Sequence, residues 1–220
     1  MTKTKSHDNL SQNNKNQQKQ HGQHEHDGCC QGHQHQMQHS EQTLHGKAPQ
    51  QKSSRNLSPE ELKKHEPFMK RAIELSRKAS LIDKSGGVFG AVVVKNGKII
   101  AEGTNQVKKT HDPTWHAEIQ AIREASKKLG TPHLEGCDLY TSAECCPLCL
   151  AAAYWAHIGT IYYGATIQDA LKYGGFDDSY ILDEIKKNAS DRKIKMKQMM
   201  APEAVEIWKE FAEMPDRARY

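Results

Sequence analysis

The sequence contains no run of apolar residues long enough to span a membrane, and its first residues lack the apolar core of a signal peptide. We therefore expect a cytoplasmic protein, because nothing directs the chain to export. Thiols stay reduced in that compartment. The six cysteines are accordingly interpreted as metal ligands and bystander thiols, and not as a disulfide framework.

Residues 1–56 have few apolar side chains and are rich in Gln, Asn, His, Lys and Ser. Such a segment cannot bury enough apolar surface to offset its loss of conformational entropy, so we expect it to be disordered and residues 57–220 to form the folded domain. Eight of the 13 histidines lie in this extension, on both sides of Cys29-Cys30. The composition indicates either a loose metal-binding tail or a solvated low-complexity extension, because composition alone carries no geometry.

Two short stretches contain the residue types of a metal centre, namely His116-Ala117-Glu118 and Cys146-Pro147-Leu148-Cys149. Cys146 and Cys149 share one face of a helix because they are three residues apart, and Pro147 suits the first helical position. The N-terminus of a helix also favours the thiolate form that binds metal. His116 and Glu118 are two residues apart, so both reach one ion only if a helix begins near His116. The pattern predicts two helix N-termini that face each other across one Zn²⁺ ion.

One imidazole and two thiolates supply three ligands and leave the fourth position of a tetrahedral zinc ion to water. This ligand set leaves the metal formally uncharged, so it acidifies water less than an all-histidine site does, and a base is needed. Glu118 is the candidate for proton transfer from that water to the substrate and then to the departing amine. The alternative interpretations are a structural zinc knuckle, which normally has a fourth Cys or His, and buried cysteines with an unrelated histidine.

The rest of the pattern predicts a three-layer α/β/α fold with a central mixed sheet of about five strands and helices on both faces. Two β-branched runs joined by Asn96-Gly97 indicate a β-hairpin. The helix expected after Cys146 is apolar all round, which indicates burial in the core or in a subunit interface. Further elements are expected, in chain order, as a helix over 115–129, strands over 137–141, 160–165 and 193–199, and a last helix over 202–212.

Several further stretches accompany these motifs: residues 90–94, 100–105, 112–118, 121–123, 139–142 and 175–179, and a C-terminal tyrosine. With them, the chain from about residue 66 onward resembles the bacterial guanine deaminases of the cytidine-deaminase-like superfamily. The His-x-Glu…Cys-x-x-Cys set is the signature of zinc-dependent nucleobase deaminases in general. The segment Phe176-Asp177-Asp178-Ser179, together with the final tyrosine, narrows the resemblance toward guanine.

The resemblance implies a role for each site residue. His116, Cys146 and Cys149 would hold Zn²⁺, and Glu118 would shuttle protons. The resemblance also implies substrate contacts. Asn105 would hydrogen-bond the purine, and Phe89 and Trp155 would be walls for a flat base. Asp178 and Tyr220 would approach the substrate from a C-terminal segment that is exchanged between the two subunits of a homodimer.

Simpler interpretations of the same residues remain open. Asn105 suits a turn-capping amide, and Asp178 suits a helix-capping acid. Phe89 and Trp155 suit ordinary core aromatics, because a buried aromatic needs no ligand. Four positions depart from the usual residues of the family: Val88, Trp115, Ala143 and Cys145. Of these, Cys145 places a third thiol next to the zinc ligands.

The implied activity is that of a zinc-dependent aminohydrolase that converts guanine to xanthine and ammonia. The alternatives are a deaminase of guanosine, cytosine or an adenosine in transfer RNA and, from another class, a non-catalytic metal-binding protein. A nucleic-acid substrate calls for a basic face, but the last helix sets Glu203, Glu206 and Glu210 against Lys209. We therefore expect a small purine base and a second copy of the chain as partners, and neither nucleic acid nor membrane.

Overall fold

The structure is a computed structural model that describes residues 57–219. The predicted disorder of residues 1–56 and the predicted role of Tyr220 lie outside these described residues. Within the described range, no helix is both long enough and apolar enough to cross a lipid bilayer.

Four strands form one mixed sheet in the order β2-β1-β3-β4. They are β1 (Gly90–Lys95), β2 (Lys98–Thr104), β3 (Cys137–Ala143) and β4 (Thr160–Ala165). Strand β1 pairs antiparallel with both β2 and β3, and β3 pairs parallel with β4. Asn96 and Gly97 both have positive φ, at 50° and 71°, as the tight turn of the predicted hairpin requires.

The described residues contain four strands rather than about five. Residues 193–199, which were predicted to be a strand, form none. Their alternating apolar side chains stay exposed, 82% for Ile194 and 69% for Met196. A strand forms only where a neighbouring strand takes up its backbone N–H and C=O groups, and alternation in the sequence does not supply that neighbour.

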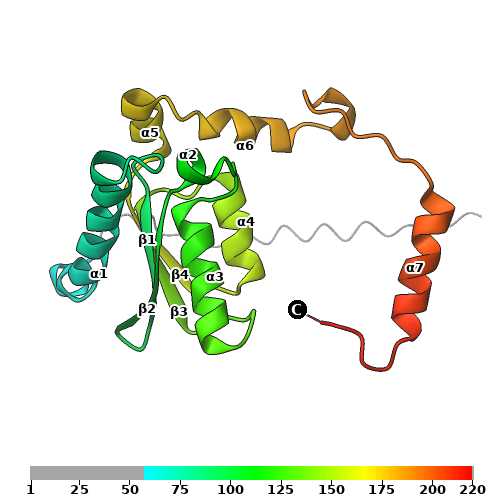
Figure 1. Ribbon diagram of the computed structural model, residues 1–220, viewed down its shortest axis with the longest axis horizontal. Coiled ribbons are helices and arrows are strands. Elements are labelled where there is room, and N and C mark those ends of the chain that lie inside the picture. Colours follow the sequence, from blue (N-terminus) through cyan, green and yellow to red (C-terminus); the bar gives the residue numbers. More distant parts are fainter. Residues whose placement is uncertain (1–56, 220) are drawn as a thin grey trace, which may run out of the picture. The chain divides into compact units, whose positions relative to one another are not determined.

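Helices cover both faces of the sheet, which confirms the predicted three-layer class (Figure 1). The helices are α1 (Pro59–Arg77), α2 (Val107–Thr110), α3 (Ala117–Leu129), α4 (Pro147–Trp155), α5 (Ile167–Gly174), α6 (Asp178–Lys186) and α7 (Ala201–Glu213), with a π-helical turn at Lys78–Ile82 and a 3₁₀ turn at Ala189–Asp191. Helix α1 begins with a capping box, in which Ser58 Oγ accepts from the backbone of Glu61 and the Glu61 carboxylate accepts from the backbone of Ser58.

The core consists of two clusters that the sheet separates. Successive residues of a strand point to opposite faces, so Ala91 and Val93 of β1 pack in the cluster that contains residues of α3 and α4. Val92 and Val94 pack in the cluster that contains residues of α1. Helices α3 and α4 therefore share one layer, and that layer contains the functional motifs.

Candidate zinc centre and active site

The two motif stretches lie at the N-termini of neighbouring helices. His116 is the N-cap residue of α3, and Cys146 is the N-cap residue of α4. Both have extended backbone, and neither side chain makes the capping hydrogen bond, so the imidazole and the thiol are available to a metal. The structure therefore has the two helix starts that the residue spacing predicts.

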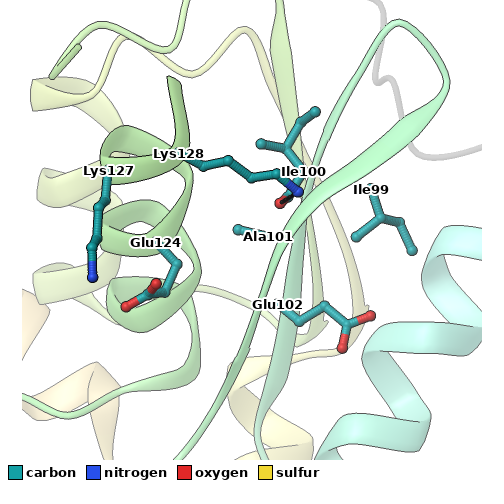
Figure 2. Close-up of a pocket in the computed structure, with 7 residues that line it drawn as sticks. All are labelled: Ile99, Ile100, Ala101, Glu102, Glu124, Lys127 and Lys128. Carbon is teal, nitrogen blue, oxygen red and sulfur yellow. Dashed lines mark hydrogen bonds between the residues drawn. The ribbon is translucent and has the colours of Figure 1, made fainter. Parts of the chain in front are cut away.

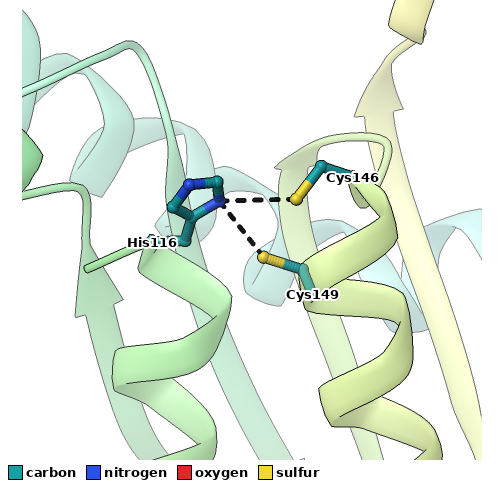
Figure 3. A group of neighbouring side chains, drawn as sticks. All are labelled: His116, Cys146 and Cys149. Carbon is teal, nitrogen blue, oxygen red and sulfur yellow. Dashed lines mark hydrogen bonds between the residues drawn. The ribbon is translucent and has the colours of Figure 1, made fainter. Parts of the chain in front are cut away.

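His116, Cys146 and Cys149 meet with the geometry of a metal centre (Figure 3). His116 Nδ1 lies 3.5 Å from Cys146 Sγ and 3.4 Å from Cys149 Sγ. Zinc bonds of about 2.05 Å to nitrogen and about 2.3 Å to sulfur place these atoms about 3.5 Å apart around a tetrahedral ion. Both separations from His116 Nδ1 therefore match those around a zinc ion. Among the described residues this cluster supplies three ligands, which is the number that a catalytic zinc site has.

The protonation of the thiols is coupled. The hydrogen bond between Cys146 and Cys149 lowers the pKa of Cys146 and raises that of Cys149, because one proton serves both sulfurs. A bound divalent cation takes the place of that proton and deprotonates a coordinating thiol. Burial raises the pKa of the neighbouring Cys145 thiol, which keeps that thiol protonated, and Cys145 is not part of the ligand cluster. In this arrangement the third thiol lies outside the ligand cluster.

Glu118 lies in the first turn of α3 and is only 3% exposed. Burial raises the pKa of its carboxyl group, so it can hold a proton closer to neutral pH than an ordinary glutamate. Thr141 Oγ1 of β3 donates a hydrogen bond of 3.0 Å to Glu118 Oε1, and the Cys149 thiol lies 3.5 Å from Oε2. Cys149 loses its proton when it binds metal and then has none to donate to Glu118 Oε2. Thr141 therefore holds Oε1 of Glu118, and Oε2 is left for proton transfer.

A pocket of about 420 Å³ opens onto these residues, and His116, Glu118 and Cys146 form part of its wall. Its volume falls in the range typical of small-molecule sites. Phe89 and Phe176 form an apolar side of the pocket, with ring centroids 5.1 Å apart in an edge-to-face arrangement. An aromatic edge and an aromatic face suit a flat ring system.

Asn105 also lines this pocket and is 4% exposed. Its Oδ1 accepts hydrogen bonds of 3.2 Å from the backbone N–H groups of Gly87 and Val107. A Cβ on Gly86 would lie 1.9 Å from Asn105 Oδ1, so the Gly86-Gly87 pair permits this close approach. The amide therefore has the turn-capping role through its oxygen, and its position in the pocket wall leaves its nitrogen for a ligand.

The two aspartates of the C-terminal segment have different positions. Asp177 is the N-cap residue of α6, and its Oδ1 accepts a hydrogen bond from Tyr180 N at 3.1 Å. Asp178 lines the pocket, and burial raises the pKa of its carboxyl group. Asp177 therefore has the capping role, and Asp178 lies in the pocket wall of its own chain rather than in that of a partner subunit; its contact with a substrate stays a prediction.

Comparisons with known proteins agree with this centre. Residues 62–165 match the model of the cytidine and deoxycytidylate deaminase zinc-binding region. The chain is 48% identical over 151 residues to a guanine deaminase of Bacillus subtilis, which covers 67% of this chain and 96% of that protein. It is 36% identical over 147 residues to a tRNA-specific adenosine deaminase of Aquifex aeolicus, covering 66% of this chain and 92% of that protein.

The solved structure of the Bacillus subtilis guanine deaminase superposes with a TM-score of 0.68 at 45% identity, over 71% of this chain and 98% of that chain. This chain belongs to the cytidine-deaminase-like family of zinc deaminases. Zinc is accordingly its cofactor, and the family fold is the one predicted from the sequence.

Trp155 is the one described candidate contact that the structure does not bring to the pocket. It lies nine residues after Cys146, at the last turn of α4, and its side chain is 67% exposed. The helical rise of about 1.5 Å per residue places it about 13 Å along the axis from the ligand end of the helix. It therefore cannot be a wall of the pocket beside His116 in the same chain.

Three residues that the sequence analysis did not assign to the site belong to it. Phe176 and Glu144 line the pocket, and Thr141 holds the buried carboxylate of Glu118. Phe176 stands in a segment that carries the family resemblance, which was a usable signal. Thr141 stands in another such segment, residues 139–142, but its contact with Glu118 depends on the packing of α3 against β3, which the sequence does not show.

A larger cavity of about 700 Å³ lies between β2 and α3 (Figure 2). Its wall includes exposed Glu124, Lys127 and Lys128 of α3, and the Lys128 ammonium donates a hydrogen bond of 3.1 Å to the backbone oxygen of Ile100. None of the zinc ligands lines it. Its residues form an ordinary solvated helix–strand groove, so the size of a cavity does not locate the chemistry in this fold.

Proposed function

We propose that this chain is a zinc-dependent guanine deaminase, which hydrolyses guanine to xanthine and ammonia. The observation that carries the proposal is the buried carboxyl of Glu118 beside a three-ligand zinc cluster, at a pocket with two phenylalanine rings. The likeness to a guanine deaminase over almost the whole of that protein supports guanine as the substrate.

Zinc, when bound, supplies a Lewis acid that makes water nucleophilic near neutral pH. Glu118 takes a proton from the attacking water and gives it to a ring nitrogen of the purine. It then takes the remaining proton of the hydroxyl group that has been added to the carbon and delivers it to the amino group, so that the C–N bond breaks and ammonia leaves. Its raised pKa suits this role because the same carboxyl must accept and release a proton. Thr141 keeps Oε1 fixed, and Oε2 carries the proton.

The pocket suits a free base better than a nucleic acid. Its wall contains the acidic side chains Glu118, Glu144 and Asp178 against a single lysine, Lys108. An acidic wall repels phosphate, whereas nucleic-acid sites are basic. Guanine offers an amino donor and two acceptors at its edges. We propose that the Asp178 carboxylate accepts from the base and that the Asn105 amide nitrogen donates to it.

We propose that residues 57–220 form the deaminase domain and that the active protein is a homodimer with exchanged C-terminal segments, so that Tyr220 reaches the site of the partner subunit. Two surfaces support association. None of the residues of α7 is buried, and its Ile207 and Trp208 are 63% and 71% exposed. Helix α4 is apolar all round and likewise leaves large side chains exposed, among them Tyr154 at 76% and Leu148 at 42%. A cytoplasmic location is in keeping with ligands that must remain free thiols.

The test of the mechanism is Glu118→Gln, which keeps the shape of the side chain and removes the proton carrier. We expect ammonia release from guanine to fall by at least about 100-fold while zinc content stays at the level of the unmodified chain. Glu124→Gln is the matched control, because it makes the same change at an exposed position of the same helix. Near-normal activity of Glu118→Gln would refute the mechanism.

The substrate is tested by ammonia release from guanine, guanosine, cytosine and an adenosine-containing anticodon stem-loop. We expect the highest kcat/KM with guanine. A higher value with any of the other three would replace guanine as the substrate and leave the zinc mechanism intact. No ammonia from any of them, with zinc bound, would favour the non-catalytic metal-binding alternative.

The exchanged dimer is tested by mixing two inactive variants, Glu118→Gln and Tyr220→Ala. If the C-terminal segment acts on the partner subunit, a mixed dimer contains one site with both native residues, and activity returns to about a quarter of the native value in a random equimolar mixture. If the segment acts within its own subunit, the mixture stays inactive. Sedimentation gives the oligomeric state independently.

A further inference from the structure

A second group of metal-ligand side chains lies outside the active-site pocket. His133 and Glu135 come from the connection between α3 and β3, and His157 comes from the turn between α4 and β4. Their donor atoms all lie within 4.8 Å of one another. Glu135 Oε1 is 2.8 Å from His157 Nδ1 and 3.9 Å from His133 Nδ1. The group follows the C-terminal ends of α3 and α4, whereas the zinc ligands described above are at or near their N-termini.

The backbone around this group is fixed by contacts of its own. Leu134 lies between two of the three residues, is fully buried, and donates a backbone hydrogen bond of 2.7 Å to Ala156 O, next to His157. His133 N donates to Thr131 Oγ1 at 3.1 Å. The two imidazole rings lie 4.8 Å apart. The side chains are therefore brought together by the fold and not by chance contact of flexible loops.

His133 carries an unsatisfied polar atom. Its Nδ1 is buried and makes no hydrogen bond with any residue in the described part of the chain, although the side chain as a whole is 33% exposed. A buried polar atom without a partner is unfavourable, and in a folded protein it calls for an explanation such as a bound ion. The hydrogen bond with His157 lowers the pKa of Glu135, so that carboxylate is available as a charged ligand.

We propose that His133, Glu135 and His157 form a second zinc site, which links the α3–β3 connection to the turn that follows α4. Tetrahedral zinc with bonds of about 2.0–2.2 Å sets neighbouring donor atoms about 3.4 Å apart. The two separations from Glu135, 2.8 and 3.9 Å, lie on either side of this value, and all three donor atoms lie within 4.8 Å of one another, so changes of at most about 1.4 Å in any separation complete the site. Two imidazoles and a carboxylate suit zinc, and the exposed side chains of Glu135 and His157 give the ion access from solvent.

The test uses the full chain with its catalytic site loaded with zinc. His157→Asn removes one ligand and suits the backbone, because His157 has a φ of 55° and asparagine tolerates the left-handed region. His111→Asn is the matched control, since it makes the same change at an exposed residue with a φ of 56° that belongs to neither cluster. His133→Gln and Glu135→Gln remove the other two ligands one at a time and carry the test if His157→Asn does not fold.

Two readouts are compared as zinc chloride is added. Equilibrium dialysis is expected to show one zinc fewer per chain in each ligand variant than in the native chain and the His111→Asn control, and the histidines of residues 1–56 contribute equally to all of them. Zinc at about 100 times its Kd is expected to raise the Tm of the native chain and the control by at least about 5 °C, and that of the ligand variants by much less. Equal zinc content and equal Tm shifts in all chains would overturn the second site. Deamination is measured separately, so a failure here leaves the proposed function standing.

Discussion

Gly103 offers a sharp test of how the sheet positions the zinc centre. It lies in β2, directly against the first turn of α3, and a Cβ there would lie 1.9 Å from Ala117 O and 2.7 Å from Ala121 N. Real Cβ atoms essentially never approach closer than 3.0 Å, so Gly103→Ala must push the start of α3 away from the sheet by about 1 Å. That end of α3 bears His116 and Glu118.

Two effects follow from this displacement. Overpacking of this kind typically costs about 1–3 kcal/mol of unfolding free energy, which corresponds to a fall in Tm of roughly 2–12 °C for a domain of this size. A misplacement of about 1 Å at the reacting groups costs roughly 100-fold in rate. We therefore expect Gly103→Ala to lose activity and zinc affinity beyond what its loss of stability explains, as measured by kcat at a temperature where the chain is folded and by its zinc content after dialysis.

The matched control is Gly90→Ala. Its Cβ would lie 2.4 Å from Ala72 O of α1, on the opposite face of the sheet, where no zinc ligand is attached. A comparable loss of Tm with most of the activity retained is expected. If Gly103→Ala keeps its native kcat and zinc content, or if both variants lose activity to the same extent, then contact with Gly103 does not position the N-terminus of α3 and its residues His116 and Glu118.

Two further predictions concern hydrogen bonds. The hydrogen bond from Thr141 lowers the pKa of the Glu118 carboxyl group, so its removal in Thr141→Val should raise that pKa and shift the pH profile of kcat/KM to higher pH. We expect kcat to fall roughly 10- to 100-fold in Thr141→Val, whereas Thr141→Ser should keep the native profile and the native kcat. An unchanged profile in Thr141→Val would rule out the positioning role of Thr141. Arg71 holds the pKa of Glu102 below its ordinary value of 4.5, so the pair stabilises the fold above that pH and ceases to do so as the pH falls through the folded-state pKa. Urea unfolding of Glu102→Gln should show a loss of about 0.5–1 kcal/mol at pH 7 that disappears in acid, and a loss that persists there would exclude the ion pair as its cause.

The parts of the site that follow from local rules were predictable from the sequence. The three-residue spacing of Cys146 and Cys149, with Pro147 between them, requires a helix start, and the position of Glu118 requires another at His116; both are present. The Asn96-Gly97 hairpin follows equally from the residues of the turn itself. Local backbone chemistry decides these features, so no knowledge of the rest of the fold was needed.

The parts that depend on distant contacts were not predictable in this way. Only the packing of α6 shows that Asp177 caps the helix and Asp178 faces the pocket. The resemblance implied Trp155 as a pocket wall, but Trp155 lies at the C-terminal end of α4, away from the zinc ligands of the same chain. Residues 193–199 alternate like a strand, yet the described residues provide no neighbouring strand for them.

The residues that hold zinc and move protons lie on different elements from the other residues of the pocket wall, and this separation is useful for redesign. The groups that hold the metal and move protons belong to α3, α4 and β3, whereas the Asn105 amide, the two phenylalanines and Asp178 belong to loops and to the start of α6. If these groups contact the base as proposed, we expect changes in these short segments, which do not bear the metal, to alter selectivity among bases. A library confined to residues 88–89, 105–108 and 176–178 would vary the proposed substrate contacts and leave the zinc ligands, Glu118 and the Gly86-Gly87 pair unchanged.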